Sequence, residues 1–226
     1  MLLLTLLTLL AIGCATRPPS IAHVHIGHAV TAARDTPDKV GYLSIAERRA
    51  QEAYDLAKLA RSEPSLDQLK MLLGEIQNTV NGVDSYSLVE SVQEVENHIK
   101  YSATSDDASE NVRLFAQSLS SMIEPVVSSS RLISLFVSEA NGITDITQMQ
   151  EVTEAIYLAC ETNWGRKSAS NATGVFFLRN EIDDMIAREN PPYATVDRWY
   201  LFNIFRLGNG SWIFRSPKGD TNNGSY

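Results

Sequence analysis

The sequence has few cysteines and no excess of basic residues, and each shortage excludes a class of protein. Only two cysteines, Cys14 and Cys160, occur among 226 residues, so a fold held together by a disulfide network is excluded. The chain has 19 basic and 27 acidic residues and a net charge of −8. Because nucleic-acid backbones and anionic lipid headgroups both attract basic surfaces, we expect no nucleic-acid partner. Any attachment to a membrane must have another source.

Motifs that mark common enzyme classes are also missing. The sequence has no Gly-rich phosphate-binding loop, no Gly-x-Ser-x-Gly, no His-Glu-x-x-His and no Cys-x-x-Cys-His for covalent haem. Cys160 lies in an apolar segment and is expected to be an inert core thiol. We therefore predict that the protein is not an enzyme. With 44% hydrophobic and 20% charged residues, the chain has the composition of a globular protein.

A run of apolar residues opens the chain. Residues 1–13 read MLLLTLLTLLAIG, which is too short to cross a bilayer but has the length of a signal-peptide core. The run ends in Leu10-Ala11-Ile12-Gly13-Cys14, which resembles the lipobox of bacterial lipoprotein precursors. The alternative is an ordinary N-terminal hydrophobic helix that happens to end in Gly-Cys.

The resemblance implies a processing event and a location. A signal peptide of residues 1–13 would be removed after Gly13, and Cys14 would receive lipid chains that anchor the protein to a membrane. Residues 14–20 would form a short tether. The resemblance also implies a place in the bacterial cell envelope, facing the periplasm. Ala15 is not the aspartate that favours inner-membrane retention in enterobacterial lipoproteins, so the outer membrane is favoured over the inner.

Residues 21–190 are predicted to form an all-α, up-down bundle of six or seven helices. A helix-start signal recurs, in which Ser or Asp precedes Glu or Gln by three residues, at Ser44, Ser65, Ser87, Asp107 and Asp145. Apolar residues repeat at helical spacing over 66–80 and over 112–126, and the second pattern continues through Pro125 to Ala140. These patterns predict helices rather than strands.

A stripe of alanines indicates one close helix–helix contact. Small side chains at helical spacing let a neighbouring helix approach, and the stripe consists of Ala46, Ala50, Ala53, Ala57 and Ala60. The first helix, near residues 22–33, also carries small residues, and we expect it to be the neighbour.

The tail, residues 191–226, has a different character. Aromatic and β-branched residues over 199–206 and 211–215 flank Gly208-Asn209-Gly210, a pattern typical of a small β-hairpin. A helix over 196–206 is the alternative. So many aromatic side chains cannot all be exposed, so we expect the hairpin to pack on the bundle. Its outer face could instead dock an envelope protein partner.

The histidines are unevenly placed. Three of the four lie in His23-Val-His25-Ile-Gly-His28. On a helix, about 100° per residue places His25 and His28 on one face and points His23 away. Ile21 and Val24 share the face of His25 and His28, so we expect that face to look inward.

The fourth histidine suggests a partner for this face. His98 follows Glu94 by one helical turn. If the two helices are adjacent, His25, His28, Glu94 and His98 would supply four metal ligands inside the bundle. Such ligands suit zinc, copper or iron, and a non-covalent haem is a second possibility. The ordinary alternative is a set of histidines bonded to backbone or solvent, with Glu94 and His98 as a surface pair.

Two function classes follow from the sequence. One is a lipid-anchored periplasmic binding protein that holds a metal or haem through histidines. The other is a structural or assembly lipoprotein of the cell envelope that acts through protein–protein contacts. If a metal binds, its occupancy is expected to fall as pH drops through the ordinary histidine pKa of about 6.5.

Overall fold

The computed structural model describes residues 20–82, 86–165, 173–190 and 193, and the backbone of three short segments near the C-terminus. These residues include seven α-helices: α2 (Ile21–Val30), α3 (Tyr42–Arg61), α4 (Leu66–Asn81), α5 (Leu88–Thr104), α6 (Glu110–Ala140), α7 (Ile146–Trp164) and α8 (Val175–Ala187). The all-α class and the helix number are thereby confirmed. Residues 1–19, with the proposed leader and Cys14, lie outside the described residues. Among the described helices, none combines the length and hydropathy needed to cross a membrane.

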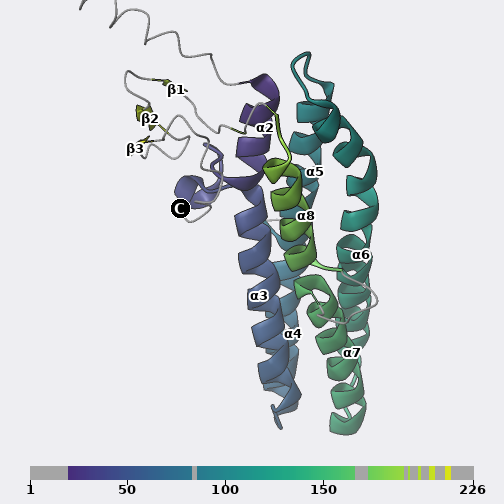
Figure 1. Ribbon diagram of the computed structural model, residues 1–226. Coiled ribbons are helices and arrows are strands. Elements are labelled where there is room, and N and C mark those ends of the chain that lie inside the picture. The colour runs from purple at the N-terminus through teal and green to yellow at the C-terminus, as the bar shows by residue number, and fades with distance from the viewer. Residues whose placement is uncertain are drawn as a thin grey trace, which may run out of the picture.

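The helices stack into columns that run side by side (Figure 1). α2 lies above α3, α5 above α4 and α8 above α7, whereas α6 forms a column by itself. α6 has 31 residues, which corresponds to a length of about 46 Å. α3 packs against α4, α5 and α7, and α6 packs against α5 and α7. The chain therefore rises and descends along one bundle, as the sequence predicted.

Short breaks divide the columns where the sequence cannot continue a helix. Between α2 and α3 the chain passes through the 3-10 turn η1 (Pro37–Lys39) and then reaches Gly41. A Cβ at Gly41 would lie 2.3 Å from the carbonyl carbon of Val30, so only glycine allows the end of α2 to approach this closely. This approach lets α2 lie at the end of the bundle next to α3.

Several helix ends agree with the sequence signals. The side chains of Ser65, Ser87 and Asp145 accept hydrogen bonds from the amides three residues later, as N-caps do. α6 ends at Ala140, as predicted. Two signals were misread. α3 begins at Tyr42 rather than at the predicted cap, Ser44, and Ser109 rather than Asp107 caps α6.

One continuous hydrophobic core runs through the bundle. All five alanines of the α3 stripe are at most 1% exposed, and larger fully buried side chains surround them, among them Leu43, Leu73, Leu119, Ile133 and Ile156. The predicted neighbour of the stripe needs correction. The main neighbours of α3 are α4, α7 and α5, and its contact with α2 is small.

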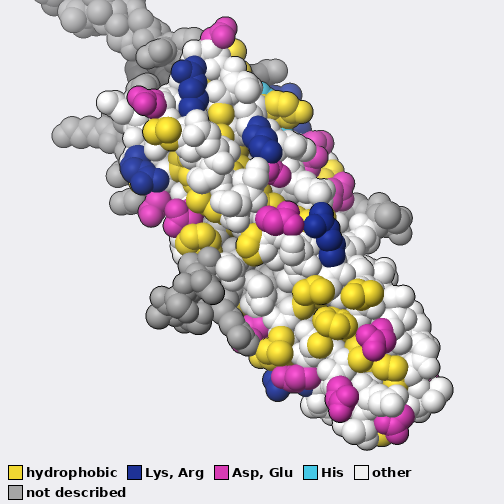
Figure 2. All heavy atoms as spheres, turned by 90° about the vertical axis from the view of Figure 1, so that its right-hand side faces the viewer, with side chains coloured by type: hydrophobic (Ala, Val, Ile, Leu, Met, Phe, Trp, Pro, Cys, Tyr) yellow, Lys and Arg dark blue, Asp and Glu magenta, His cyan; other side chains and the backbone are white. Residues whose placement is uncertain are grey.

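The face shown in Figure 2 carries acidic and basic side chains of both signs, interspersed with apolar ones. No broad basic stripe gathers on this face.

Three short strands are described in the tail: β1 (Arg198–Trp199), β2 (Ile204–Arg206) and β3 (Trp212–Phe214), paired antiparallel in that order. The side chains of these strands and the segments that join them lie outside the described residues. The hairpin turn, the packing of the aromatic tail on the bundle and its use as a docking face therefore stay predictions.

Candidate metal centre

Three of the four proposed ligands come together. His25, His28 and His98 each have a ring nitrogen in the group, and these three nitrogens all lie within 4.8 Å of one another. The Nδ1 atoms of His25 and His98 are 3.4 Å apart, and the ring centroids of His28 and His98 are 5.2 Å apart. Among the described residues, this is the one group of three or more such side chains that could hold a metal ion.

The cluster forms because α2 and α5 lie side by side in opposite directions. Ser102 near the end of α5 donates a hydrogen bond to the carbonyl of Ala22 near the start of α2, at 2.9 Å. One turn further along α2, His25 meets His98, which lies one turn earlier in α5. His28 lies on the same face as His25 because the two are three residues apart. The helical spacing noticed in the sequence thus places both imidazoles beside His98.

Glu94, the fourth proposed ligand, does not join the group of ligand atoms. Its carboxylate accepts a hydrogen bond from the side-chain amide of Asn97 at 3.3 Å. The antiparallel register that pairs His25 with His98 puts residue 94 level with the last turn of α2. The described residues therefore provide three histidine ligands rather than three histidines and a carboxylate.

The prediction that the face of His25 and His28 looks inward was wrong. Ile21 is 61% exposed, and both imidazoles are only partly buried. His23 and Ile26 on the other side of α2 are buried instead. His23 does point away from the cluster, as predicted, but it points into the bundle.

A second layer of aromatic and acidic groups lies behind His98. The buried ring of Tyr42 stacks on the imidazole of His98, with centroids 5.5 Å apart and planes inclined by 28°. The hydroxyl of Tyr42 donates to the Asp35 carboxylate at 2.7 Å, and the Tyr86 hydroxyl donates to the Asp35 carbonyl. These contacts fix the ring of Tyr42, which in turn limits the orientations open to His98.

Burial lowers the pKa of two of the imidazoles. Desolvation, with smaller effects from His28 and His25, lowers the pKa of His98 to about 4, despite the opposing charge of Asp35. Desolvation and the neighbouring His28 also lower the pKa of His25. A neutral imidazole is the form that binds a metal. Because protons compete less for these two rings, we expect metal occupancy to persist below the pH of about 6.5 that an ordinary histidine would set.

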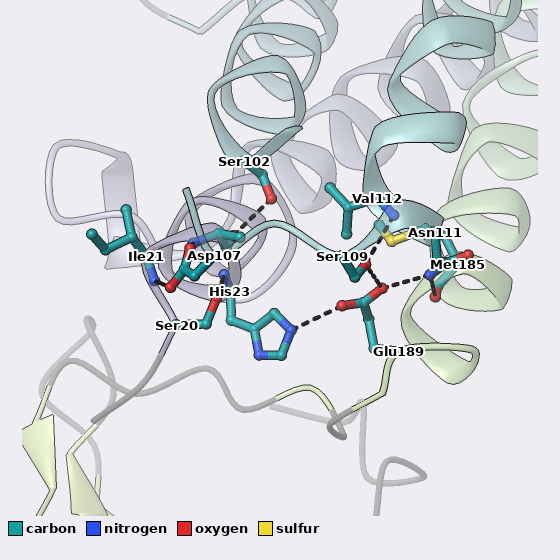
Figure 3. Close-up of polar contacts among 11 residues, drawn as sticks. Ser20, Ile21, His23, Ser102, Asp107, Ser109, Asn111, Val112, Met185 and Glu189 are labelled. Atoms are coloured by element: carbon teal, nitrogen blue, oxygen red, sulfur yellow. Dashed lines mark hydrogen bonds and ion pairs between the residues drawn. The ribbon is translucent and has the colours of Figure 1, made fainter. Parts of the chain in front are cut away.

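A polar cluster at the end of the bundle holds α2 in place (Figure 3). The Asp107 carboxylate accepts hydrogen bonds from the amides of Ile21 and Ala22, at 2.7 and 3.1 Å. It therefore satisfies the first amides of α2 from across the bundle, whereas Ser109 caps the adjacent helix α6. The Nε2 atom of His23 lies 3.0 Å from the Glu189 carboxylate. These contacts tie the start of α2 to the α5–α6 connection and to the end of α8.

The separation of two of the ligand nitrogens suits one metal ion. Ligand nitrogens about 2.0–2.1 Å from a tetrahedral zinc lie about 3.3 Å from each other, and the His25–His98 separation of 3.4 Å is close to that value. The same contact is a hydrogen bond between the two imidazoles. Imidazole ligands favour zinc, copper, nickel or iron over magnesium and calcium, which prefer oxygen.

Sequence reasoning missed the residues around the ligands. Tyr101 lies one turn after His98, and its ring centroid is 5.6 Å from that of His25; helical spacing could have found it. Asp35 and Tyr42 could not have been found, because only the turn between α2 and α3 brings them to His98. Cys160 agrees with expectation: it is fully buried, and burial raises the pKa of its thiol to about 12.

Comparison with known proteins adds no relative. The chain matches no protein family, and neither a curated protein nor a solved structure is significantly similar to it.

Proposed function

We propose that this protein is a lipid-anchored binding protein of the bacterial cell envelope that holds one divalent transition-metal ion through His25, His28 and His98. The observation that carries the metal site is the convergence of three ring nitrogens within 4.8 Å. The lowered pKa values of His25 and His98 support it, as does the layer of Tyr42 and Asp35 that holds His98. The anchor and the location rest on the resemblance of residues 10–14 to a lipobox.

A single ion fits these residues better than haem does. The porphyrin occupies four positions around haem iron and leaves at most two for side chains. Three imidazoles that converge on one point cannot all bind such an iron. Of the two cofactors, a metal ion and a haem, the metal ion is therefore the better fit.

Metal binding is expected to stabilise the fold. Untagged protein, stripped of metal and then saturated with Zn²⁺ or Cu²⁺, should melt about 10 °C higher, because an ion at 1,000 times its dissociation constant adds about 4 kcal/mol. His98→Ala should abolish this shift, since it removes the ligand from α5 and leaves two on α2. Differential scanning calorimetry gives the shift, and elemental analysis of the untagged protein gives the metal content.

Two variants on α5 serve as controls. Asn97→Ala changes an exposed neighbour of His98 and should keep the full shift. Glu94→Ala should keep it as well if the three histidines are the ligands. If the wild-type protein neither contains metal nor melts higher with any of zinc, copper or nickel, the metal proposal fails. A structural or assembly lipoprotein acting through protein contacts is then the better account.

The lipid anchor has a separate test. Cys14→Ser should abolish incorporation of radiolabelled palmitate and leave the uncleaved precursor, because both steps need the thiol at position 14. Cys160→Ser is the matched control, and its product should still be labelled and processed. A Cys14→Ser protein that is still cut and still labelled would show that residues 1–14 are not a lipoprotein leader.

A further inference from the structure

The histidine cluster has one buried and one exposed tyrosine as neighbours. Behind His98 lies Tyr42, which is 4% exposed and has its hydroxyl bonded to Asp35. Tyr101, a second aromatic neighbour of the cluster, is 56% exposed. Its ring centroid lies 5.6 Å from that of His25 and 6.2 Å from that of His98. A ligand that reaches the cluster from solvent therefore arrives beside the ring of Tyr101.

Three protein ligands leave a tetrahedral ion with one position to fill. Glu94 does not fill it, and the described residues contribute no other carboxylate or thiol to the group. A site with an open position exchanges ligands with its surroundings, in contrast to a closed structural site.

The surroundings of the open position favour a neutral, planar donor. Asp35 and Glu94 both act on the neighbouring Tyr42, so their negative charge offsets part of the charge of a bound dication and weakens its attraction for an anionic ligand. Rings make the other contacts: His25 with His28, His28 with His98, and His98 with Tyr42. A further ring can pack on Tyr101 by the same edge or offset contacts.

We propose that the open position of the metal site binds an external imidazole, which packs against Tyr101. This inference rests on the metal site proposed above and adds the chemical class of its exchangeable ligand. An imidazole can come from a histidine side chain of another polypeptide or from a free small molecule, and the two sources share this chemistry.

Cobalt(II) is a suitable probe because its visible absorption reports the number and type of its ligands. The Co²⁺-loaded protein should show tetrahedral bands that shift on titration with imidazole, and acetate or azide at equal concentration should shift them less. Tyr101→Ala should weaken the binding of imidazole about five-fold, the magnitude of one lost ring contact, and leave Co²⁺ affinity unchanged. Tyr101→Phe keeps the ring and should behave as wild type.

The two proposals fail in different ways. If Co²⁺ gives no bands at all, the metal site itself is refuted. If the bands appear but do not respond to imidazole, or respond more strongly to azide, the ligand inference is overturned. A loss of the imidazole response in Tyr101→Phe would overturn it too, because the Tyr101 hydroxyl rather than its ring would then hold the imidazole. Capped Gly-His-Gly identifies the source: binding as tight as that of free imidazole supports a polypeptide histidine, and weaker binding supports a small molecule.

Discussion

Replacing Glu189 with alanine should lower the free energy of unfolding by about 3 kcal/mol, one of the largest effects expected from a single substitution in this protein. The Glu189 side chain is 1% exposed. It accepts hydrogen bonds from His23 Nε2 at 3.0 Å, from Ser109 Oγ at 2.6 Å and from Asn111 Nδ2 at 2.6 Å (Figure 3). Alanine would leave all three donors, the buried His23 and the partly buried Ser109 and Asn111, without this acceptor.

The arrangement also fixes the protonation of both partners. An ionised carboxylate only accepts hydrogen bonds, so the Nε2 atom of His23 must carry the proton it donates. Burial by itself would raise the pKa of Glu189, but the hydrogen bonds from His23, Ser109 and Asn111 outweigh it, and the pKa is lowered. The ionised form is therefore the one that stabilises the fold.

The pH dependence follows from the direction of that shift. A carboxyl group with a lowered pKa in the folded state contributes its full stability above its unfolded pKa of about 4.3. The contribution is lost as pH falls through the lower pKa of the folded protein. Urea denaturation should therefore show a large difference between wild type and Glu189→Ala at pH 7 and a smaller one at pH 3.

Two further variants test this account of Glu189. Glu189→Gln keeps the shape and one acceptor oxygen, so its loss of stability should be smaller than that of alanine. Asp184→Ala changes an exposed acidic residue of α8 and should alter stability by less than about 0.5 kcal/mol. Equal losses in Glu189→Ala and Asp184→Ala would mean that the buried cluster does not stabilise the bundle.

Ala53→Leu should destabilise the bundle by about 3 kcal/mol and lower the melting temperature by roughly 9 °C. Ala53 is 0% exposed and lies in the middle of the alanine stripe of α3. The stripe faces a core shared with α4, α5 and α7. A leucine would need room for three more carbon atoms, and the packed helices can supply it only by moving apart.

The neighbouring position provides the control for this substitution. Glu52 is exposed, and its partner Arg49 forms a surface ion pair with it, which is worth little. Glu52→Leu therefore adds the same side chain to the same helix without entering the core, and thermal melting should be nearly unchanged. If Ala53→Leu melted at the same temperature as Glu52→Leu, the stripe would not be a close helix contact.

Local signals in the sequence determined much of the secondary structure. The capping side chains of Ser65, Ser87 and Asp145 accept hydrogen bonds from amides only three residues away. Both partners therefore lie in one short segment, and the sequence alone predicts the contact. The same holds for the face shared by His25 and His28, because helical geometry fixes it once the helix is assumed. Apolar spacing likewise predicted the helices and their number.

Contacts between distant segments explain what the sequence could not provide. Asp107 lies where a cap for α6 is expected, yet it bonds to amides more than 80 residues earlier. His23 has its partner, Glu189, 166 residues away. A local pattern carries no information about such a partner.

The candidate site shows the same division. Local spacing by itself paired His25 with His28 and singled out His98. The register between α2 and α5 decided that His98 meets them and that Glu94, one turn away, does not. The turn that precedes α3 decided that Tyr42 and Asp35 would stand behind His98. Hydrophobic periodicity predicts which side of a helix is buried, but it does not predict the register between that helix and its neighbour. The register is set by the packing of the whole bundle.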